Sequence, residues 1–305
     1  NMAITKVRVK INGVWSNLAL NSSTGKWEGT ITAPATTSYN QSGGYWPVTV
    51  EATNSAGTVT TVDATDYTIG AALRLIVKET VKPVINLVQP SNGAYISNNM
   101  LPIIFDVTDE AGGSGVKLST VALKLAGTTY KDGNAGMSKA AITNGYRFTY
   151  TPQSALEDGA KTIEINASDN DGNAANKVTA SYTIDTVPPT LTISEPASGL
   201  ITNQSNQVIK GVTNDTTSSP VTVSIVHGSK TYEPAVDTSG AFTQAVVLTE
   251  GTNTIKVTAM DAAGKTTEIT LTVNLDTTVP AVKSVIMSPN PANVSGSVVI
   301  TLEVE

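Results

Sequence analysis

Apolar and polar residues alternate along much of the chain, which is the pattern of β-strands that bury one face. Three segments repeat this pattern: "VTVEATNSAGT" (48–58), "KTIEINASDNDGN" (161–173) and "NTIKVTAMDAAGK" (253–265). In each of them the alternating residues lead to an Ala, then to an Asn or Asp two positions later, and then to a Gly. Each segment therefore predicts a strand that ends in a tight turn, with Val50, Ala52 and their counterparts on the buried face.

The strands that follow these turns repeat as well. The segment "KVTASYTIDTVPP" (177–189) matches "TTEITLTVNLDTTVP" (266–280), and a shorter echo ends at Glu79. In each case the strand is followed by an acid, Thr and then Pro, which removes a backbone donor and stops the strand. The acids Glu79, Asp185 and Asp276 are spaced by about 100 residues, the size of one immunoglobulin-like sandwich. Because no stretch shows a helical period, the predicted fold class is all-β.

The repeat divides the chain into residues 1–78, 79–186, 187–279 and 280–305. The two middle parts predict complete immunoglobulin-like β-sandwich domains in tandem. The first part lacks the opening strands of such a domain, and the last part holds only opening strands, which are marginal alone. We expect the natural chain to continue past residue 305. The alternatives are that the terminal strands pack back on the preceding domain, or that they complete the first domain of a second copy, head to tail.

Composition narrows the classes of function. Charged residues make up 14% of the chain and the net charge is −6, with no basic stripe of the kind that nucleic-acid binding needs. Cysteine is absent, which excludes disulfides and thiolate metal sites. No apolar run approaches 18 residues, so membrane insertion is not expected.

Two segments carry a family resemblance: "SDNDGNAANKVTASYTIDTVPPTL" (168–191) and "TAMDAAGKTTEITLTVNLDTTVP" (258–280). They resemble bacterial immunoglobulin-like domain arrays of the Big type, which occur on adhesins, cell-wall enzymes and tailed-phage virions. The resemblance covers residues 80–280 well and residues 1–79 partly. It implies a spacer, display or adhesion role, and the fold alone does not fix which of these applies.

The start of the chain bears on location. We take Asn1 as an addition and Met2 as the natural start, and no signal segment follows, so export by the general secretory route is not expected. The opening "MAITKVRVKINGVWSNL" (2–18) looks like that of a prophage tail-associated protein. We therefore predict a non-enzymatic, virion-associated array of modules that acts as a spacer or display rod. The alternatives are a secreted cell-surface adhesin fragment that binds glycan or protein, and an accessory module of a larger cell-wall or carbohydrate-active enzyme.

Catalysis is not expected, because the sequence has no phosphate loop, His-Glu metal motif or nucleophile elbow. The single histidine, His227, has no second His, Cys or poised acid near it in sequence and predicts a solvated turn residue. No cofactor is required by any motif.

The stretch "ASDNDGN" (167–173) looks at first like a calcium loop. Asp169, Asp171 and Asn173 take positions 1, 3 and 5 of an EF-hand pattern. That pattern also needs Gly at position 6 and Glu at position 12, where this chain has Ala174 and Ala180. The EF-hand interpretation therefore fails.

A different calcium site is predicted at the junction of the first two domains. In an immunoglobulin-like sandwich, the entry linker and the loops after the second and penultimate strands lie at the same end. Oxygen ligands from these segments suit Ca²⁺, and the candidates are Glu79, Asp106, Asp109, Glu110, Asp169 and Asp171. In the next domain the equivalents form a thinner set: Asp185, Asp215 and Asp261. The commoner role of such side chains is to hydrogen-bond the backbone of their own turns, and on sequence alone we favour that role.

Three aromatic residues, Tyr39, Tyr45 and Trp46, lie in an insertion that has no counterpart in the later domains. One interpretation is a stacking surface for a sugar or a protein partner. The other, which we favour, is that these side chains cover an edge that the missing strands leave open.

Overall fold

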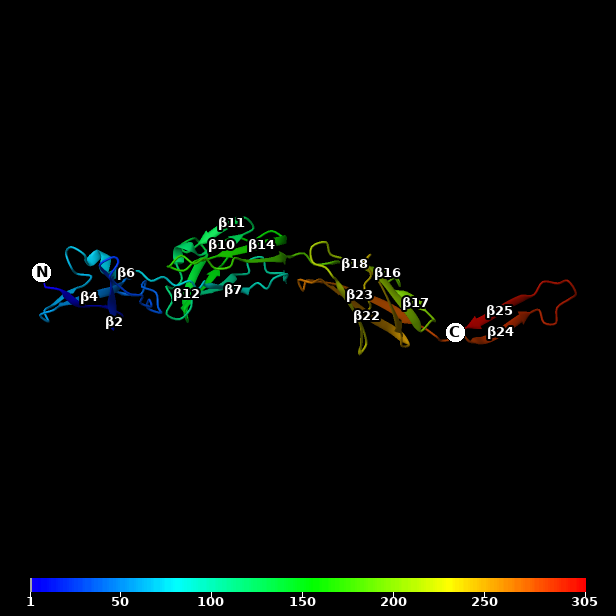
Figure 1. Cartoon of the computed structure of the whole chain (residues 1–305). Coiled ribbons are helices and arrows are strands. Elements are labelled where there is room, and N and C mark those ends of the chain that lie inside the picture. The colour runs from blue at the N-terminus through cyan, green and yellow to red at the C-terminus, as the bar shows by residue number, and fades with distance from the viewer. Residues whose placement is uncertain (1) are drawn as a thin grey trace. The chain divides into compact units, whose positions relative to one another are not determined.

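The computed structural model describes residues 2–305 and consists almost entirely of β-strands, as the alternating pattern predicts (Figure 1). The only helices in residues 2–305 are three short 3-10 turns: η1 (Ser42–Gly44), η2 (Gly70–Leu73) and η3 (Leu118–Thr120). None of these helices has the length and apolar character needed to cross a membrane. The chain divides into two compact units, one ending at Ile184 and the other starting at Asp185.

The first strands of the first unit form a single sheet in the order β3-β2-β1-β4-β5, with β6 paired to β4. Its strands are β1 (Ile4–Ile11), β2 (Val14–Asn21), β3 (Lys26–Glu28), β4 (Trp46–Asn54), β5 (Val59–Val62) and β6 (Arg74–Leu75). All strands of residues 2–78 belong to this sheet, so few of its side chains are covered. Val50 and Ala52, predicted as buried, are only half-buried for this reason, whereas Val7 and Val9 are buried.

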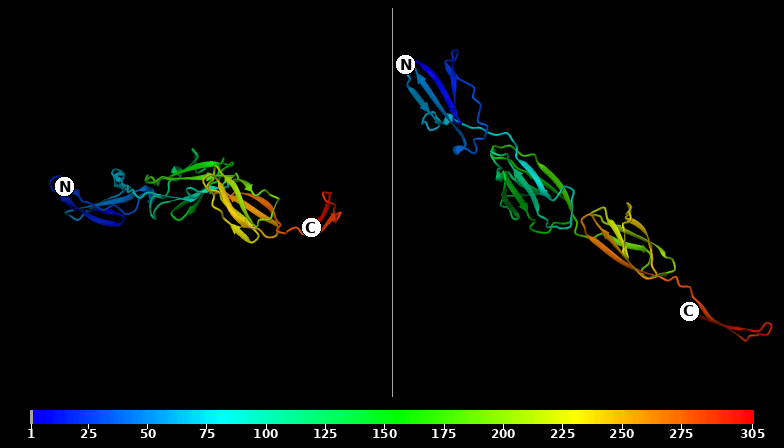
Figure 2. Two further views of the ribbon diagram at one scale, coloured as in Figure 1. Left: turned by 90° about the vertical axis from the view of Figure 1, so that its right-hand side faces the viewer. Right: turned by 90° about the horizontal axis from the view of Figure 1, so that it is seen from below.

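The rest of the first unit is a two-layer sandwich (Figure 2). One sheet has the order β12-β13-β9-β7 and consists of β7 (Val84–Gln89), β9 (Ile103–Thr108), β12 (Met137–Ile142) and β13 (Gly145–Tyr150). The other has the order β11-β10-β14-β15-β8 and consists of β8 (Tyr95–Ile96), β10 (Ala122–Leu125), β11 (Thr128–Lys131), β14 (Gly159–Asn166) and β15 (Val178–Ile184). The stacked rings of Phe105 and Phe148, 5.2 Å apart, share one core with Ile163 and Ile165 of the facing sheet. The predicted alternation is thus confirmed on β14.

The second unit contains a second sandwich of the same kind. One sheet has the order β16-β18-β21 and consists of β16 (Thr190–Glu195), β18 (Asn206–Asn214) and β21 (Ala241–Val247). The other has the order β17-β23-β22-β19-β20 and consists of β17 (Leu200–Thr202), β19 (Thr222–His227), β20 (Lys230–Tyr232), β22 (Gly251–Met260) and β23 (Thr266–Leu275). Ile209 of the smaller sheet packs in a core with Ile225, Ile255 and Val257 of the larger one.

The strands that open the two sandwiches lie at sheet edges, as their prolines predict. Pro90 follows β7 and Pro196 follows β16. Beyond each proline the chain changes sheets, since β8 pairs in parallel with β15 and β17 pairs in parallel with β23. A residue without an N–H is suited to the point where a strand leaves its ladder.

The last elements, β24 (Val282–Ser288) and β25 (Val299–Val304), form a hairpin. Neither strand pairs with any other strand in residues 2–305. Apolar side chains on both strands are exposed, including those of Val285, Ile286 and Leu302.

The loops after β9 and β14 meet at one end of the first sandwich. The Lys117 N–H donates to the Ser168 carbonyl at 2.9 Å, and the Asn170 N–H donates to the Gly115 carbonyl at 3.0 Å. The entry segment also reaches this end, because the Ser114 N–H donates to Glu79. These contacts bring together acidic residues that are far apart in sequence.

Candidate metal centre

Four carboxyl groups converge at this end of the sandwich, and we call Glu79, Asp109, Glu110 and Asp169 the first acidic cluster. Glu79, Asp109 and Asp169 each place one carboxylate oxygen within 4.8 Å of the others. Glu110 contacts the carboxyl groups of Glu79 and Asp109. Asp109 and Asp169 are buried, and the two glutamates are half-buried.

The strand pattern explains why Asp109 points inward. On β9 the buried positions are Ile103, Phe105 and Val107, and Asp109 continues this alternation just past the end of the strand. Asp169 reaches the same place from the turn after β14. Its Oδ1 accepts hydrogen bonds from the N–H groups of Gly172 at 2.6 Å and Asn173 at 2.8 Å.

The backbone holds one oxygen of each of two further carboxylates. Asp109 Oδ2 accepts from the Gly115 N–H at 2.6 Å, and Glu79 Oε1 accepts from the Ser114 N–H at 2.8 Å. The turn-bonding role that the sequence favoured is therefore present at Asp169. It accounts for only part of the hydrogen-bonding capacity of the cluster.

Three buried oxygens of the cluster receive no hydrogen bond from any group outside the cluster: Glu79 Oε2, Asp109 Oδ1 and Glu110 Oε2. Asp109 is the clearest case, because only 7% of its surface is exposed. None of the ion pairs in residues 2–305 includes a member of the cluster. Buried carboxylates without a donor or a counter-charge are costly, so this arrangement favours a bound cation.

The electrostatics of the cluster fit this interpretation. Hydrogen bonding to Glu79, followed by desolvation, raises the pKa of Glu110 to about 7. Burial raises the pKa of Asp109. At Glu79 desolvation acts in the raising direction, but hydrogen bonds with Glu110 and Ser114 outweigh it, so the pKa is lowered. Acids at such short range do not all ionise together, so Glu110 is partly protonated near neutral pH.

Asp171 was predicted as a ligand, and the structure places it beside the cluster. Its Oδ2 accepts hydrogen bonds from the Thr37 hydroxyl and from the Glu79 N–H, the latter at 3.1 Å. Asn40 donates to the Gly113 carbonyl at 2.6 Å. Asp171 and Asn40 therefore bind the entry segment and the first sheet's long loop to the end of the sandwich.

Asp106 was also predicted as a ligand, and the structure contradicts this. It lies on the outward face of β9, because it alternates with the buried Phe105 and Val107. Both of its oxygens accept from the Arg147 guanidinium at 2.8 Å.

The thinner second set of acids also comes together. We call Asp185, Asp215 and Asp261 the second acidic cluster, since each has one oxygen within 4.8 Å of the others. All three residues belong to the second unit.

The three predicted partner-binding aromatic residues do not form one surface. Tyr45 and Trp46 line a pocket of about 470 Å³ together with Lys10, Asn12 and Asp63, and Tyr39 is not among its lining residues. Arg74 lies over the Tyr45 ring at 5.0 Å, and the Trp46 indole N–H donates to the Thr36 carbonyl at 3.3 Å.

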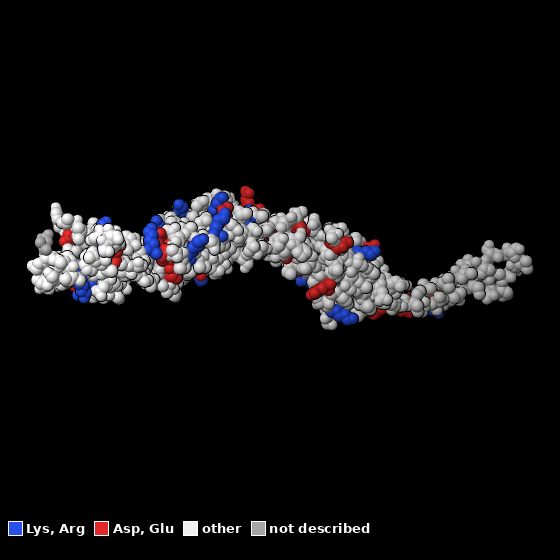
Figure 3. Space-filling model, viewed as in Figure 1, with Lys and Arg blue, Asp and Glu red and all other residues white. Residues whose placement is uncertain are grey.

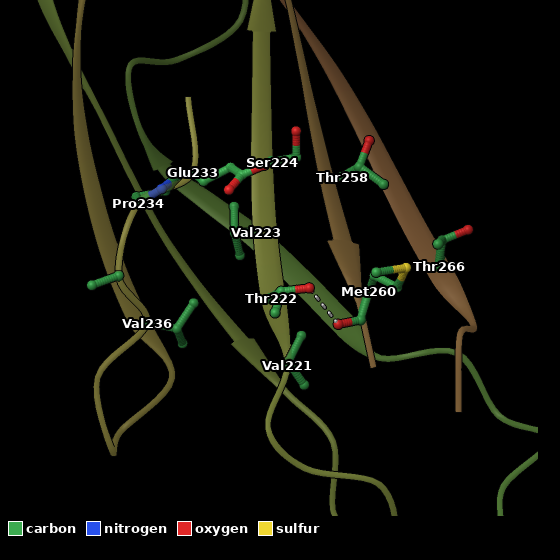
Figure 4. A pocket seen from close by; sticks show the side chains of 11 residues that line it. Val221, Thr222, Val223, Ser224, Glu233, Pro234, Val236, Thr258, Met260 and Thr266 are labelled. Atoms are coloured by element: carbon green, nitrogen blue, oxygen red, sulfur yellow. Dashed lines mark hydrogen bonds between the residues drawn. The ribbon is translucent and has the colours of Figure 1, made fainter. Parts of the chain in front are cut away.

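A second cavity, of about 500 Å³, lies on the second sandwich (Figure 4). Its lining is apolar side chains and hydroxyl groups, with Glu233 as the one titratable residue. The Thr222 hydroxyl is bonded to the Met260 carbonyl at 3.2 Å. His227 lies on β19 rather than in a turn, with its Nε2 2.9 Å from Asn253 Oδ1.

Signals for the supporting residues were weak in the sequence. Thr37 and Asp171 are 134 residues apart, and Ser114 lies in a Gly-rich loop with no motif of its own. The acids themselves were found because they follow strands.

Two sequence comparisons match parts of this chain to known proteins. Residues 189–277 match the family described as glucodextranase, domain B. Over 144 residues, 47% of the chain, it is 32% identical to Bacillopeptidase F of Bacillus subtilis (strain 168), and the match spans only 9% of that protein. The chain is thus similar to one part of a far longer protein.

Two solved structures match the chain at low identity. Fibronectin(III)-like modules of CbhA from Clostridium thermocellum are 16% identical with a TM-score of 0.40, covering 63% of this chain and 94% of that one. A structure from a 1.5-MDa bacterial ice-binding adhesin is 20% identical with a TM-score of 0.33, covering 90% and 88%. The sheets described above make this chain a tandem array of immunoglobulin-like β-sandwich modules.

Proposed function

We propose that the chain is a non-catalytic array of immunoglobulin-like modules that acts as a spacer or display element at a virion or cell surface, and that calcium at the first acidic cluster fixes the segment between its first modules. The observation that carries the calcium site is Asp109, a buried carboxylate whose Oδ1 has no donor and which faces other acids without a counter-charge.

Calcium suits the donor set. The available groups are carboxylate oxygens, which hard cations prefer, and they come from loops and a linker rather than from one rigid element. Calcium accepts variable geometry and six to eight oxygen ligands, whereas magnesium demands near-octahedral order. Glu79, Asp109, Glu110 and Asp169 would hold the ion, and the ion would supply the positive charge that the cluster lacks.

Binding there would act on the connection between modules. Glu79 lies in the segment that leaves the first sheet, while Asp109 and Asp169 belong to loops of the following sandwich. A shared ion would tie the three segments together and restrain the entry segment. Short linkers already limit the motion of neighbouring modules, and the ion would limit it further.

The surface role is supported by composition and by similarity. Charges are sparse, and on the face drawn in Figure 3 acidic and basic side chains are interspersed over the two sandwiches. The two named sequence matches are to parts of proteins whose names are those of enzymes, which gives weight to an accessory-module role. The secreted adhesin and the accessory module of a larger enzyme stay as alternatives to the virion location, and the neighbouring natural sequence would separate the three.

The calcium site is tested by titrating the metal-free full-length chain with calcium chloride in a calorimeter, and by melting it in calcium and in a chelator. We expect calcium to raise the melting temperature, and Asp109→Asn to remove that rise at the first sandwich. Glu157→Gln, an exposed acid of the same sandwich, is the matched control. Equal melting in calcium and in chelator would overturn the site.

A second candidate function is sugar binding at the pocket of Tyr45 and Trp46. Two aromatic faces next to Lys10, Asn12 and Asp63 are groups that stack on and hydrogen-bond a saccharide. A glycan array with Trp46→Ala tests this, and Tyr67→Ala is the control, because Tyr67 is a fully exposed tyrosine outside the pocket lining. Binding that survives Trp46→Ala would argue against the pocket.

Head-to-tail self-association also stays a prediction. The β24–β25 hairpin exposes apolar side chains that another sheet would cover. A monomer in light scattering at high protein concentration would contradict this prediction of self-association.

A further inference from the structure

The second acidic cluster is built from three separate segments of the second unit. Asp185 precedes the first strand, Asp215 directly follows β18 and Asp261 directly follows β22. Asp185 is completely buried and Asp261 is 4% exposed, while Asp215 is half-buried. Three carboxylates therefore meet at one end of the sandwich, with one oxygen of each within 4.8 Å of the others.

Backbone and hydroxyl groups fix each carboxylate in place. Asp215 Oδ1 accepts from the Thr217 and Ser218 N–H groups, both at 2.8 Å. Asp261 Oδ1 accepts from the Lys265 N–H at 2.8 Å. Asp185 accepts from the Val187 N–H at 3.0 Å and from the Ser218 hydroxyl. The cluster is preorganised, because its members are held by groups other than one another.

One oxygen is left over. Asp261 Oδ2 is buried without any hydrogen-bond donor, on a side chain that is more than nine-tenths buried. No Lys, Arg or His forms an ion pair with the cluster anywhere in residues 2–305. Neutral donors fix the geometry of these acids but leave their negative charge uncompensated, which is costly at a buried position.

We propose that Asp185, Asp215 and Asp261 form a second, independent site for a hard divalent cation, with calcium as its natural ion. A cation would pair with Asp261 Oδ2 and cancel the repulsion among the three carboxylates. A water molecule at the same place would donate to Asp261 Oδ2 but would leave the charge. The cation explains both the missing donor and the missing counter-charge.

The site goes beyond the proposed first site and depends on none of its residues. It joins the entry of the second unit to the loops after β18 and β22, so its ion would stabilise this sandwich rather than the first. Binding to the folded state alone raises stability by mass action, as at other structural metal sites.

The number of charged ligands separates the two sites in affinity. Once calcium has displaced the proton on Glu110, the first cluster offers four carboxylates and the second offers three, and calcium affinity in such sites depends on how many ligands are charged. We therefore expect the second site to bind calcium more weakly. It should also fill later in a titration.

The experiment is calorimetric titration of the metal-free full-length chain with calcium chloride, on wild type, Asp261→Asn and Asp109→Asn. Wild type should bind two ions, and each variant should lose a different one. Asp276→Asn is the matched control, because Asp276 also accepts a backbone N–H, that of Thr278, and it follows the far end of β23, whose other end pairs with Met260 beside the cluster. It should keep both ions.

Thermal unfolding in the presence of a chelator distinguishes a variant that fails to fold from one that folds but has lost the calcium site. The Asp261→Asn variant would keep the acceptor for the Lys265 N–H and would replace the donor-less oxygen with an NH₂ group that can donate to the neighbouring carboxylates. This variant should therefore be at least as stable as wild type without calcium and gain less from calcium. A purely structural turn role would predict the same loss of stability in both conditions.

Each outcome assigns one site. A single ion that Asp109→Asn removes would overturn the second site and leave the first standing. A single ion that Asp261→Asn removes would do the opposite. No binding, or two ions bound by Asp261→Asn, would overturn the second site.

Discussion

The two acidic clusters use the same positions of two similar sandwiches. Each takes one acid from the entry segment, one from directly after the second long strand, and one from the turn after the penultimate strand. These acids are Glu79, Asp109 and Asp169 in the first cluster and Asp185, Asp215 and Asp261 in the second. In both clusters the turn acid binds its own turn through one oxygen and turns toward the others. The fold therefore supplies a frame that any three carboxylates at these positions will share.

The difference lies in what the loops add to this frame. The first cluster gains Glu110, whose extra carboxyl group brings a proton with it near neutral pH. It also has Asp171, which binds the entry segment instead of joining the cluster. The second cluster has only its three acids, with Ser218 donating to two of them through different atoms. The loops thus decide affinity and pH response, while the strands decide location.

The largest expected effect comes from destabilising the hydrophobic core of one sandwich while leaving the other unchanged. Phe148→Ala opens a cavity in the first sandwich, where Phe148 is completely buried against Phe105. Such a truncation costs about 3–5 kcal/mol. The first sandwich should then unfold, and lose its calcium, at a lower temperature. The second sandwich should keep both its unfolding temperature and its calcium. Calorimetric scans in excess calcium measure both transitions.

Phe242→Ala, in the core of the second sandwich, is the mirror variant and should show the reverse. If either variant lowered both transitions equally, the two clusters would belong to one cooperative unit and the comparison would fail.

The next largest effect is a pH dependence of stability and of calcium affinity that arises from Glu110, the fourth acid of the first cluster. The folded-state pKa of Glu110 is raised from 4.5 to about 7, so the folded protein binds a proton that the unfolded chain releases. In chelator, stability that is fully present below pH 4.5 is therefore lost as the pH rises toward 7. Calcium must displace this proton, so its affinity for the first cluster should rise over the same range. Urea unfolding and calcium titration at several pH values measure this.

Glu110→Gln should flatten both pH profiles between these limits. A wild-type calcium affinity for the first cluster that does not change from acidic to neutral pH would show that Glu110 is no ligand.

A smaller effect is expected from the glycine beneath the first cluster. A Cβ at Gly113 would lie 2.7 Å from Glu110 Cδ and 2.9 Å from Asp109 Oδ2. Gly113→Ala should therefore push both acids out of place and weaken calcium binding at the first cluster about 10-fold or more, by analogy with residues that orient metal ligands. The second cluster should be unaffected. Ala111→Ser, at an exposed position of the same loop, is the control.

Much of the fold followed from the sequence because period-two alternation acts locally. Ile163 and Ile165 were predicted on the buried face of a strand, and they are completely buried. The same alternation predicted that Val50 is buried, but Val50 is only half-buried. Burial also needs a facing sheet, and residues 2–78 form a single sheet. Pro90 and Pro196 account for the edge positions of β7 and β16, but they do not specify the crossing between sheets beyond them. Which sheet a strand joins depends on long-range pairing that no local pattern encodes.

The candidate site shows the same division. Asp109 and Asp169 were predicted to lie together because the loops after the second and penultimate strands reach the same end of a sandwich, and these two loops are hydrogen-bonded to each other. Asp106 was misplaced although its alternation with Phe105 and Val107 was visible in the sequence, and this pattern would have placed it outside. Thr37 had no signal at all, because its contact with Asp171 depends on how the first loop packs.

The smallest expected effect tests that correction. Asp106→Asn breaks an ion pair in which Arg147 is about half exposed, so we expect a loss of under about 1 kcal/mol. The hydrogen bond from Arg147 lowers the pKa of Asp106, with burial opposing it, so this contribution is present above the ordinary carboxyl pKa and disappears as the pH falls through the lower folded value. Urea unfolding at neutral and at low pH measures it. The number of calcium ions bound should stay at the wild-type value. Loss of an ion would show that Asp106 is a ligand of the first cluster after all. It would also mean that the alternation of the strand does not decide which acids bind calcium.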